Sequence, residues 1–142
     1  MRKILNFIYR FKIFKRIIPS LIKIVIRLFN IKEIKIIHND LVFLINPRNP
    51  IDREIYLKDK YELEQINFLT NIIKSNGIQN FIDIGAHMGF YSINLSKQKI
   101  KIYAFEPIIE NYNQLEKNIL INKIENINKF NFALSNVKKS VV

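Results

Sequence analysis

An alternation of short strand-like and helix-like segments in the second half of the chain most constrains the fold. Strands are predicted in "NFIDIG", "IKIYAFEP" and "INKFNFALS", and helices in "GFYSINLSKQ" and "IENYNQLEKNILIN". Apolar residues at helical spacing predict another helix over 61–75, and Gly77 follows it as a stop signal. Strands that alternate with helices at this spacing form βαβ units. The sequence therefore predicts an α/β fold with a parallel sheet.

The first half of the chain carries the signals of a hairpin and a loop. Residues 33–46 predict two short strands around a turn at Asn39-Asp40. The "PRNP" stretch at Pro47–Pro50 predicts a loop after the second strand. His38, in the predicted hairpin, is interpreted as a surface or turn residue without a catalytic role.

The net charge of +11 is concentrated in residues 1–30, which hold eight basic residues and no acid, so residues 31–142 carry only +3. Basic residues four positions apart gather on one side of this segment, which Pro19 interrupts. These pairs are Lys12 with Arg16 and Lys23 with Arg27. We therefore distinguish a basic amphipathic arm over 1–30 from a domain over 31–142.

Three roles for this arm stay open from the sequence. It would anchor the protein on anionic lipid, or form helices that pack on the domain with their lysines in solvent. Binding to nucleic acid has less support, because the rest of the chain is not basic. Neither a membrane-spanning helix nor a signal peptide is predicted. The chain has no cysteine, which fits a reducing compartment, so we expect a cytoplasmic protein, with membrane contact if the arm is an anchor.

The stretch "FIDIGAHMGF" at Phe81–Phe90 has the form of a ligand-binding turn between a strand and a helix. Gly85 would let the backbone turn sharply, and Gly89 would let the next helix pack closely. A dinucleotide-binding turn would read G-x-G-x-x-G, but His87 replaces its second glycine. That glycine lets the backbone touch a pyrophosphate, so its absence argues against NAD and FAD. No Gly-Lys-Ser/Thr follows, which excludes a P-loop.

Two acids frame this turn. Asp83 ends the first predicted strand, and Glu106 ends the second, just before Pro107. A carboxylate at the second position can accept the hydroxyls of a ribose, as several nucleoside cofactors require. An acid before the glycines would repel a pyrophosphate but suit a sulfonium and an amino group. The pair therefore favours S-adenosyl-L-methionine (SAM) over NAD.

Several stretches, in their order, resemble the FkbM family of SAM-dependent methyltransferases. They are "FIDIGAHMGFYSINLS", "YAFEP", "NYNQLEKNILIN" and "NFALSN", with "YELEQ" upstream. The family pattern reads D-x-G-A-N-x-G-x-[FY], then A-[FW]-E-P, then L-x-x-N-x-x-x-N and A-[LV]-[SG]. The resemblance covers about residues 60–136.

The resemblance implies a Rossmann-like class I methyltransferase fold, SAM as cofactor, and methyl transfer to a hydroxyl of a sugar, glycan or natural product. The cofactor contacts that it implies are Asp83, Gly85, Ala86, His87, Gly89 and Glu106, with Glu62 as a further contact to the methionine end. His87 stands where the family has Asn, either lining the cofactor or exposed in the loop. Asn118 and Asn122 match family asparagines and are interpreted as helix-surface or capping residues.

The family domain continues well beyond the third strand, whereas this sequence reaches Val142 soon after it. We therefore expect an incomplete parallel sheet of the first three βα units, preceded by the helical arm and the hairpin. No residue before Val142 is a convincing catalytic base, and no cluster of metal ligands is visible. The expected partner is a small-molecule or glycan acceptor, without nucleic acid. Two alternatives to the enzyme are a non-catalytic SAM-binding remnant and a membrane-surface interaction protein.

Overall fold

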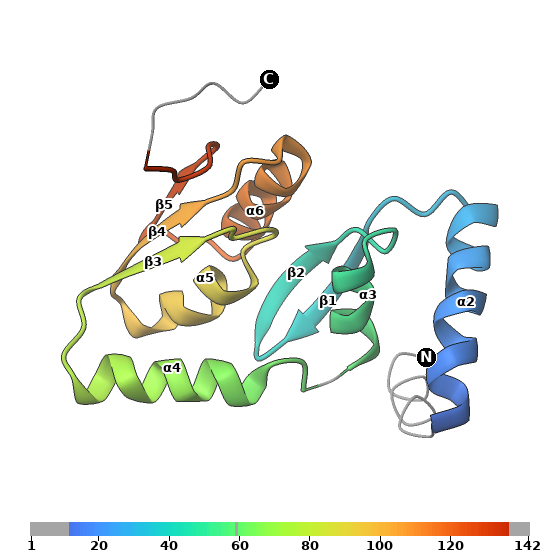
Figure 1. Ribbon diagram of the computed structural model, residues 1–142, viewed down its shortest axis with the longest axis horizontal. Coiled ribbons are helices and arrows are strands. Elements are labelled where there is room, and N and C mark those ends of the chain that lie inside the picture. Colours follow the sequence, from blue (N-terminus) through green and yellow to red (C-terminus); the bar gives the residue numbers. More distant parts are fainter. Residues whose placement is uncertain (1–11, 59, 137–142) are drawn as a thin grey trace. The chain divides into compact units, whose positions relative to one another are not determined.

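The computed structural model describes residues 12–58 and 60–136, with side chains from residue 18 onward. Contacts divide the chain into two compact units, Met1–Leu63 and Glu64–Val142, which are described separately (Figure 1). The sequence-based division at residue 30 stays a prediction. No helix among the described residues is long and apolar enough to cross a membrane.

The described part of the first unit contains two helices and a hairpin. Its elements are α2 (Lys12–Leu28), β1 (Ile34–His38), β2 (Leu41–Ile45) and α3 (Pro50–Leu57). β1 and β2 pair antiparallel in a register that runs from Ile34↔Ile45 to His38↔Leu41. Both turn residues have left-handed backbones, with φ of 50° at Asn39 and 60° at Asp40. Two such residues form the turn that matches the twist of a hairpin, and the predicted hairpin is confirmed.

The expectation that His38 lies at the surface is wrong, because its side chain is only 3% exposed. Side chains alternate between the two faces of a strand, and His38 shares the inward face of β1 with Ile36. Its ring lies edge-on to Phe43 of β2, with the centroids 6.5 Å apart. His38 is therefore part of the core of this unit.

α2 runs through Pro19 as one helix, so the expected break at this proline is not found. Ile18 of α2 packs against Leu57 of α3, with Ile22 and Tyr56 at the edge of the contact. Apolar burial on both sides of the proline helps to offset the backbone hydrogen bond that proline cannot make.

α3 was not predicted from the sequence. Asn49 caps its first turn, since the side-chain oxygen accepts the N–H of Ile51 at 2.9 Å. Pro50 follows at the first helical position, where its missing N–H costs nothing. The predicted loop thus ends at Asn49.

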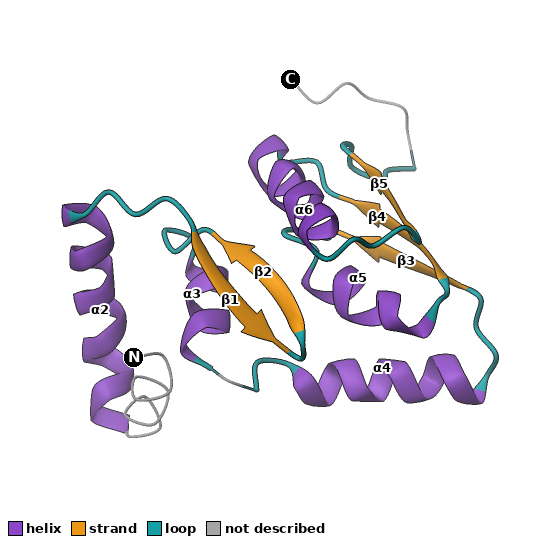
Figure 2. Cartoon of the chain, turned by 180° about the vertical axis from the view of Figure 1, so that it is seen from behind, coloured by secondary structure: helices purple, strands orange, loops and turns teal. Residues whose placement is uncertain are grey.

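The second unit is a parallel sheet with helices between its strands (Figure 2). Its elements are α4 (Leu63–Ser75), β3 (Asn80–Ile84), α5 (Phe90–Leu95), a 3-10 turn η1 (Ser96–Gln98), β4 (Lys101–Phe105), α6 (Ile109–Ile121) and β5 (Ile127–Phe130). The strand order is β3-β4-β5, with both pairs parallel. The predicted alternation of strands and helices is confirmed.

One face of this sheet carries the core of the second unit. Ile73 of α4 and Leu95 of α5 pack with Ile102 of β4 and, at the edge, with Phe81 of β3. Further along the same face, Lys129 of β5 forms an ion pair of 2.7 Å with Glu116 of α6. Right-handed crossovers that advance in one direction across a sheet put their helices on the same face. α5 and α6 therefore both cover this face.

The opposite face of the sheet, here called the open face, exposes large apolar side chains. Ile82 and Ile84 of β3 are more than half exposed. The rings of Phe105 and Phe130 stack with their centroids 4.8 Å apart, and Phe132 packs edge-on against Phe105. The aromatic cluster on this face therefore lies at the solvent boundary of the unit.

Candidate functional site

The carboxyl ends of β3 and β4 bring the predicted turn and both acids together. Residues 85–89 leave β3 and cross toward the end of β4, where the carbonyl of Phe105 accepts the N–H groups of Gly85 at 2.8 Å and Ala86 at 3.0 Å. These two bonds hold the turn against the neighbouring strand. Ligands of open α/β sheets bind at this edge, so the position agrees with the prediction.

Every second residue of the turn has a left-handed backbone. The φ angles are +78° at Gly85, +52° at His87 and +85° at Gly89. Glycine adopts this conformation without strain, and Asn and His are among the side-chain-bearing residues that tolerate it best. His87 and an Asn at this position would therefore both tolerate the left-handed backbone. The half-buried His87 also donates its N–H to Glu106 at 2.7 Å.

Gly89 permits close packing of the turn against α5, as predicted, and also against α6. A Cβ at this position would overlap Cδ1 of Leu115 in α6 and lie 3.0 Å from Cδ1 of Ile93 in α5. By contrast, nothing lies within 4 Å of a Cβ built on Gly85. Gly85 is therefore needed for its backbone angle, and Gly89 for both its angle and its size.

Glu106 is a buried carboxylate, only 3% exposed, that ties two segments together. Its Oε2 accepts the N–H of His87 in the turn, and its Oε1 accepts the N–H of Ile108 at 2.9 Å, just before α6. The side chain of Asn111 adds a longer bond of 3.4 Å to Oε1. A carboxylate has about four acceptor positions. Three are used, so two ribose hydroxyls can bind Glu106 only if one donor, most simply Asn111, moves away.

Asp83 accepts a hydrogen bond of 2.6 Å from the hydroxyl of Ser92 in α5. Burial raises the pKa of Asp83, and the negative charge of Glu106 raises it further, while the bond from Ser92 acts in the opposite direction. The two carboxyl groups are thus close enough for the charge of Glu106 to disfavour the ionised form of Asp83. A cation placed between them would be stabilised by both.

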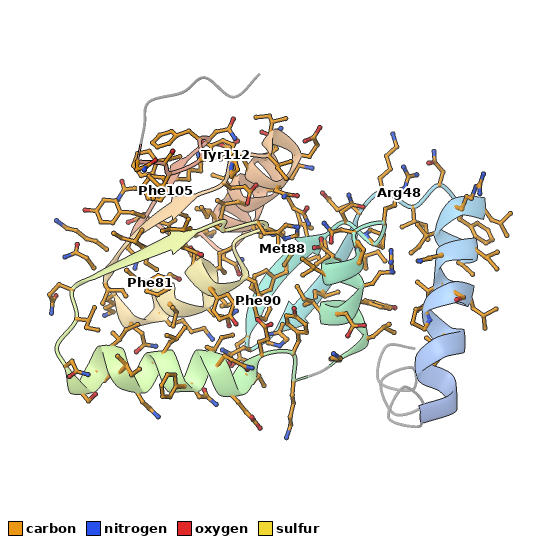
Figure 3. The ribbon with its side chains drawn as sticks, in the orientation of Figure 1. Arg48, Phe81, Met88, Phe90, Phe105 and Tyr112 are labelled. Carbon is orange, nitrogen blue, oxygen red and sulfur yellow. The ribbon has the colours of Figure 1, made fainter. Side chains whose placement is uncertain are left out.

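Sequence reasoning missed two side chains that hold the turn in place. Ser92 is fully buried under Asp83, and Asn118 of α6 is fully buried, donating from Nδ2 to the carbonyl of Met88 at 3.1 Å. The interpretation of Asn118 as a helix-surface residue is therefore wrong. Its partner Asn122 donates to the Asn118 carbonyl at 2.8 Å, close to the end of α6. Met88 and Phe90, on either side of Gly89, are also buried (Figure 3).

The structure brings Asp83, Gly85, Ala86, His87, Gly89 and Glu106 into one region of the second unit. Their contact with a cofactor stays a prediction. Ala86 is buried, and the N–H groups of Gly85, Ala86, His87 and Gly89 are all donated within the chain. Glu62, with φ of 48°, belongs to the other unit, so its predicted role is likewise untested.

No protein-family model matches this chain, and comparison with curated proteins gives no match. Among solved structures, the chain is similar to PH0793 of Pyrococcus horikoshii, described as a transferase, with a TM-score of 0.56 at 17% identity. It is also similar to the Pyrococcus abyssi tRNA (uracil-54, C5)-methyltransferase in complex with S-adenosyl-L-homocysteine, with a TM-score of 0.54 at 15% identity. A third similar structure is M. jannaschii TYW2 in complex with AdoMet, with a TM-score of 0.55 at 22% identity.

The three alignments cover 72%, 70% and 69% of this chain, but 37%, 24% and 42% of the other chains, in the same order. This chain thus spans less than half the length of each similar protein. At these identities the likeness concerns the fold. The chain has an α/β, Rossmann-like fold with a parallel sheet of three described strands, similar in fold to the methyltransferases among these structures.

Proposed function

We propose that the turn between β3 and α5 binds SAM. The observation that carries this proposal is the pair of carboxyl groups on either side of the turn, Asp83 with its raised pKa and Glu106. A ligand with a positive sulfonium and an ammonium group would relieve their repulsion. Two of the similar solved structures contain S-adenosyl-L-homocysteine or AdoMet, which supports the same choice of ligand.

Each residue of the site would have a distinct part in holding this ligand. Asp83 would face its positive end, and Glu106 would accept a ribose hydroxyl with its remaining capacity. Gly85, Ala86, His87 and Gly89 would shape the backbone that approaches it, and Glu62 would be a contact to the methionine end. Ser92 and Asn118 would act as positioning residues, because they contact Asp83 and the turn.

We further propose methyl transfer of the FkbM type, to a hydroxyl group of a sugar, glycan or natural product. The cofactor would supply the methyl group: an acceptor oxygen bonds to its carbon, the carbon–sulfur bond breaks, and the hydroxyl proton passes to a base or to water. Alignment of the two reactants would provide much of the acceleration. The order of the FkbM-like motifs supports this acceptor class. One similar structure is a tRNA methyltransferase, but we do not propose tRNA as the substrate of this chain, because one fold serves many acceptors.

Isothermal titration of the whole chain with SAM tests the cofactor assignment. Asp83→Ala and Glu106→Gln should each weaken binding by roughly 10- to 100-fold, the range for a hydrogen bond to a charged group. Glu110→Gln, which removes an exposed acid from the first turn of α6, is the matched control and should bind like the parent. Circular dichroism checks that each variant folds. Equal affinity in the parent and both site variants would contradict the proposal.

A second candidate is a chain that binds SAM without transferring its methyl group. The observation that favours it is that the residues brought together at the turn would account for cofactor binding, and none of them is assigned to the acceptor. Transfer of a labelled methyl group to hydroxyl-bearing glycans separates the two candidates. Binding without transfer would support the second, whereas label on tRNA would contradict a hydroxyl acceptor of the glycan class.

A further inference from the structure

α2 presents an apolar stripe that no described residue of its own unit covers. The stripe consists of Leu21, Ile24, Val25, Leu28 and, just after the helix, Phe29, which are between 47% and 75% exposed. Their spacing of three and four residues puts them along one side of the helix. Ile18 and Ile22, which pack against α3, lie three residues before Leu21 and Val25 and therefore border this stripe. Packing against α3 thus covers the border of the stripe and leaves its five residues largely in solvent.

A basic pocket lies beside the same helix. Its volume is about 370 Å³, and it is lined by Lys23, Ile26, Arg27, Asn30, Pro47, Arg48 and Arg53. Four of these residues are cations and none is an acid. Arg48 lies in the loop after β2 and donates from Nη2 to Oδ1 of Asn30 at 2.6 Å, which holds it close to the end of α2 (Figure 3).

The deepest cation of the pocket is fixed by the backbone. Arg53 is 7% exposed and donates from Nη1 to the carbonyls of Pro47 at 3.1 Å and Arg48 at 2.8 Å. Carbonyl oxygens do not neutralise its charge. Together with Lys23 and Arg27, which are exposed on α2, it makes a persistent positive field at this surface.

We propose that α2 and this pocket dock the protein on an anionic lipid bilayer. The apolar stripe would enter the boundary between headgroups and acyl chains, and the flanking cations would contact lipid phosphates. Nucleic acid would satisfy the charges but leave the stripe in water. A second copy of the chain would cover the stripe but bring like charges together. A bilayer satisfies both features at once, and this role is independent of the proposed SAM site.

Sedimentation of the whole chain with vesicles tests the apolar part. Binding to vesicles of phosphatidylcholine mixed with phosphatidylglycerol should be strong, and binding to phosphatidylcholine alone should be weak. Leu28→Glu should lower the partition coefficient by roughly 10-fold or more, because it removes an apolar side chain from the boundary. Phe68→Glu, on the exposed side of α4, is the matched control and should bind like the parent.

The charged part needs a second comparison. Replacing Arg27 and Arg48 by Gln should weaken binding by about 5-fold per charge, and added salt should reduce the difference between the double variant and the parent. Replacing the exposed Lys35 and Lys101 by Gln removes the same charge elsewhere and should have a smaller effect. Thermal unfolding confirms that the variants are folded.

Three results would overturn the proposal. They are equal partition of the parent and Leu28→Glu, equal binding to neutral and anionic vesicles, and a parent dimer that Leu28→Glu converts to a monomer with no vesicle binding by either. Binding to RNA in preference to anionic vesicles would also count against it.

Discussion

His87 shows how one residue can satisfy a backbone requirement that is usually met by another type. Its left-handed backbone lies between two left-handed glycines, and its N–H reaches Glu106. A β-branched side chain is strained in this conformation. We expect His87→Val to lower the free energy of unfolding by about 1–2 kcal/mol. His87→Asn, the matched control, should change it by no more than about 0.5 kcal/mol, as measured by urea denaturation. If His87→Val had the same free energy of unfolding as the parent, the left-handed backbone angle would not matter for stability.

The raised pKa of Asp83 implies that the free energy of unfolding depends on pH. Because burial raises its pKa, the folded state holds the proton more tightly than the unfolded state. Its contribution to stability is therefore fully present below the ordinary carboxyl pKa and is lost as the pH rises through the raised value. Asp83→Asn cannot ionise, so its stability relative to the parent should increase from acid to neutral pH. Urea denaturation at several pH values measures this difference.

Glu110→Gln is the control for this titration, because Glu110 is an exposed acid of the same unit. Its stability relative to the parent should change less with pH. If Asp83→Asn followed the parent at every pH, the raised pKa would be wrong.

At the scale of elements, three helices end in the same way. α2, α4 and α6 are each followed by a left-handed residue, namely Asn30, Gly77 and Lys123. In each case the next N–H donates to a carbonyl five residues earlier, from Ile31 to Ile26, Ile78 to Ile73 and Ile124 to Ile119. The sequence predicts this ending only at Gly77, because only glycine marks the left-handed position reliably.

Lys123 is therefore a position where glycine should stabilise the chain. Lys123→Gly removes a strained side-chain-bearing residue from a left-handed backbone, and we expect a gain of about 0.5–1 kcal/mol in the free energy of unfolding. The reciprocal change, Gly77→Lys, should cost a similar amount, since no atom lies within 4 Å of a Cβ at Gly77 to add a clash. Thermal and urea unfolding measure both variants. Changes of the same sign would contradict the explanation.

The predictable parts of the fold and site are those whose signals are local. The hairpin turn, the end of α4, the strand-turn-helix unit and its two acids can all be read from neighbouring residues. Ser92 and Asn118 could not, because a polar residue in a helix usually faces solvent and only the tertiary fold brings these two under Asp83 and Met88. α3 was missed although Asn49 and Pro50 carry a helix-start signal.

At the scale of the whole molecule, the open face of the second unit leaves large apolar side chains in contact with water. Parallel sheets are normally covered on both faces. Here the open face exposes Ile82 and Ile84, and the aromatic cluster around Phe105 lies on it. Large exposed apolar patches promote association. We therefore expect the isolated chain to self-associate through this face.

Analytical ultracentrifugation tests this expectation. Replacing Ile82 and Ile84 by Lys should raise the concentration at which the chain stays monomeric by several-fold. The control is the replacement of Ile37 and Ile51 by Lys, since both are also exposed but belong to the first unit. This pair should have a smaller effect. Equal effects of the two pairs would show that association is not specific to the open face.

The hydrogen bonds of Glu106 have a consequence for how ligand binding would be detected. Its carboxylate already accepts the amides of His87 and Ile108. One ribose hydroxyl can take the free acceptor position, but a second one competes with Asn111 or with a backbone amide, so affinity reflects the difference between two sets of bonds. Most ligands slow hydrogen exchange in the loops that they touch. At this site, a ligand that displaces the amide of His87 would instead leave that amide hydrogen to exchange faster with solvent.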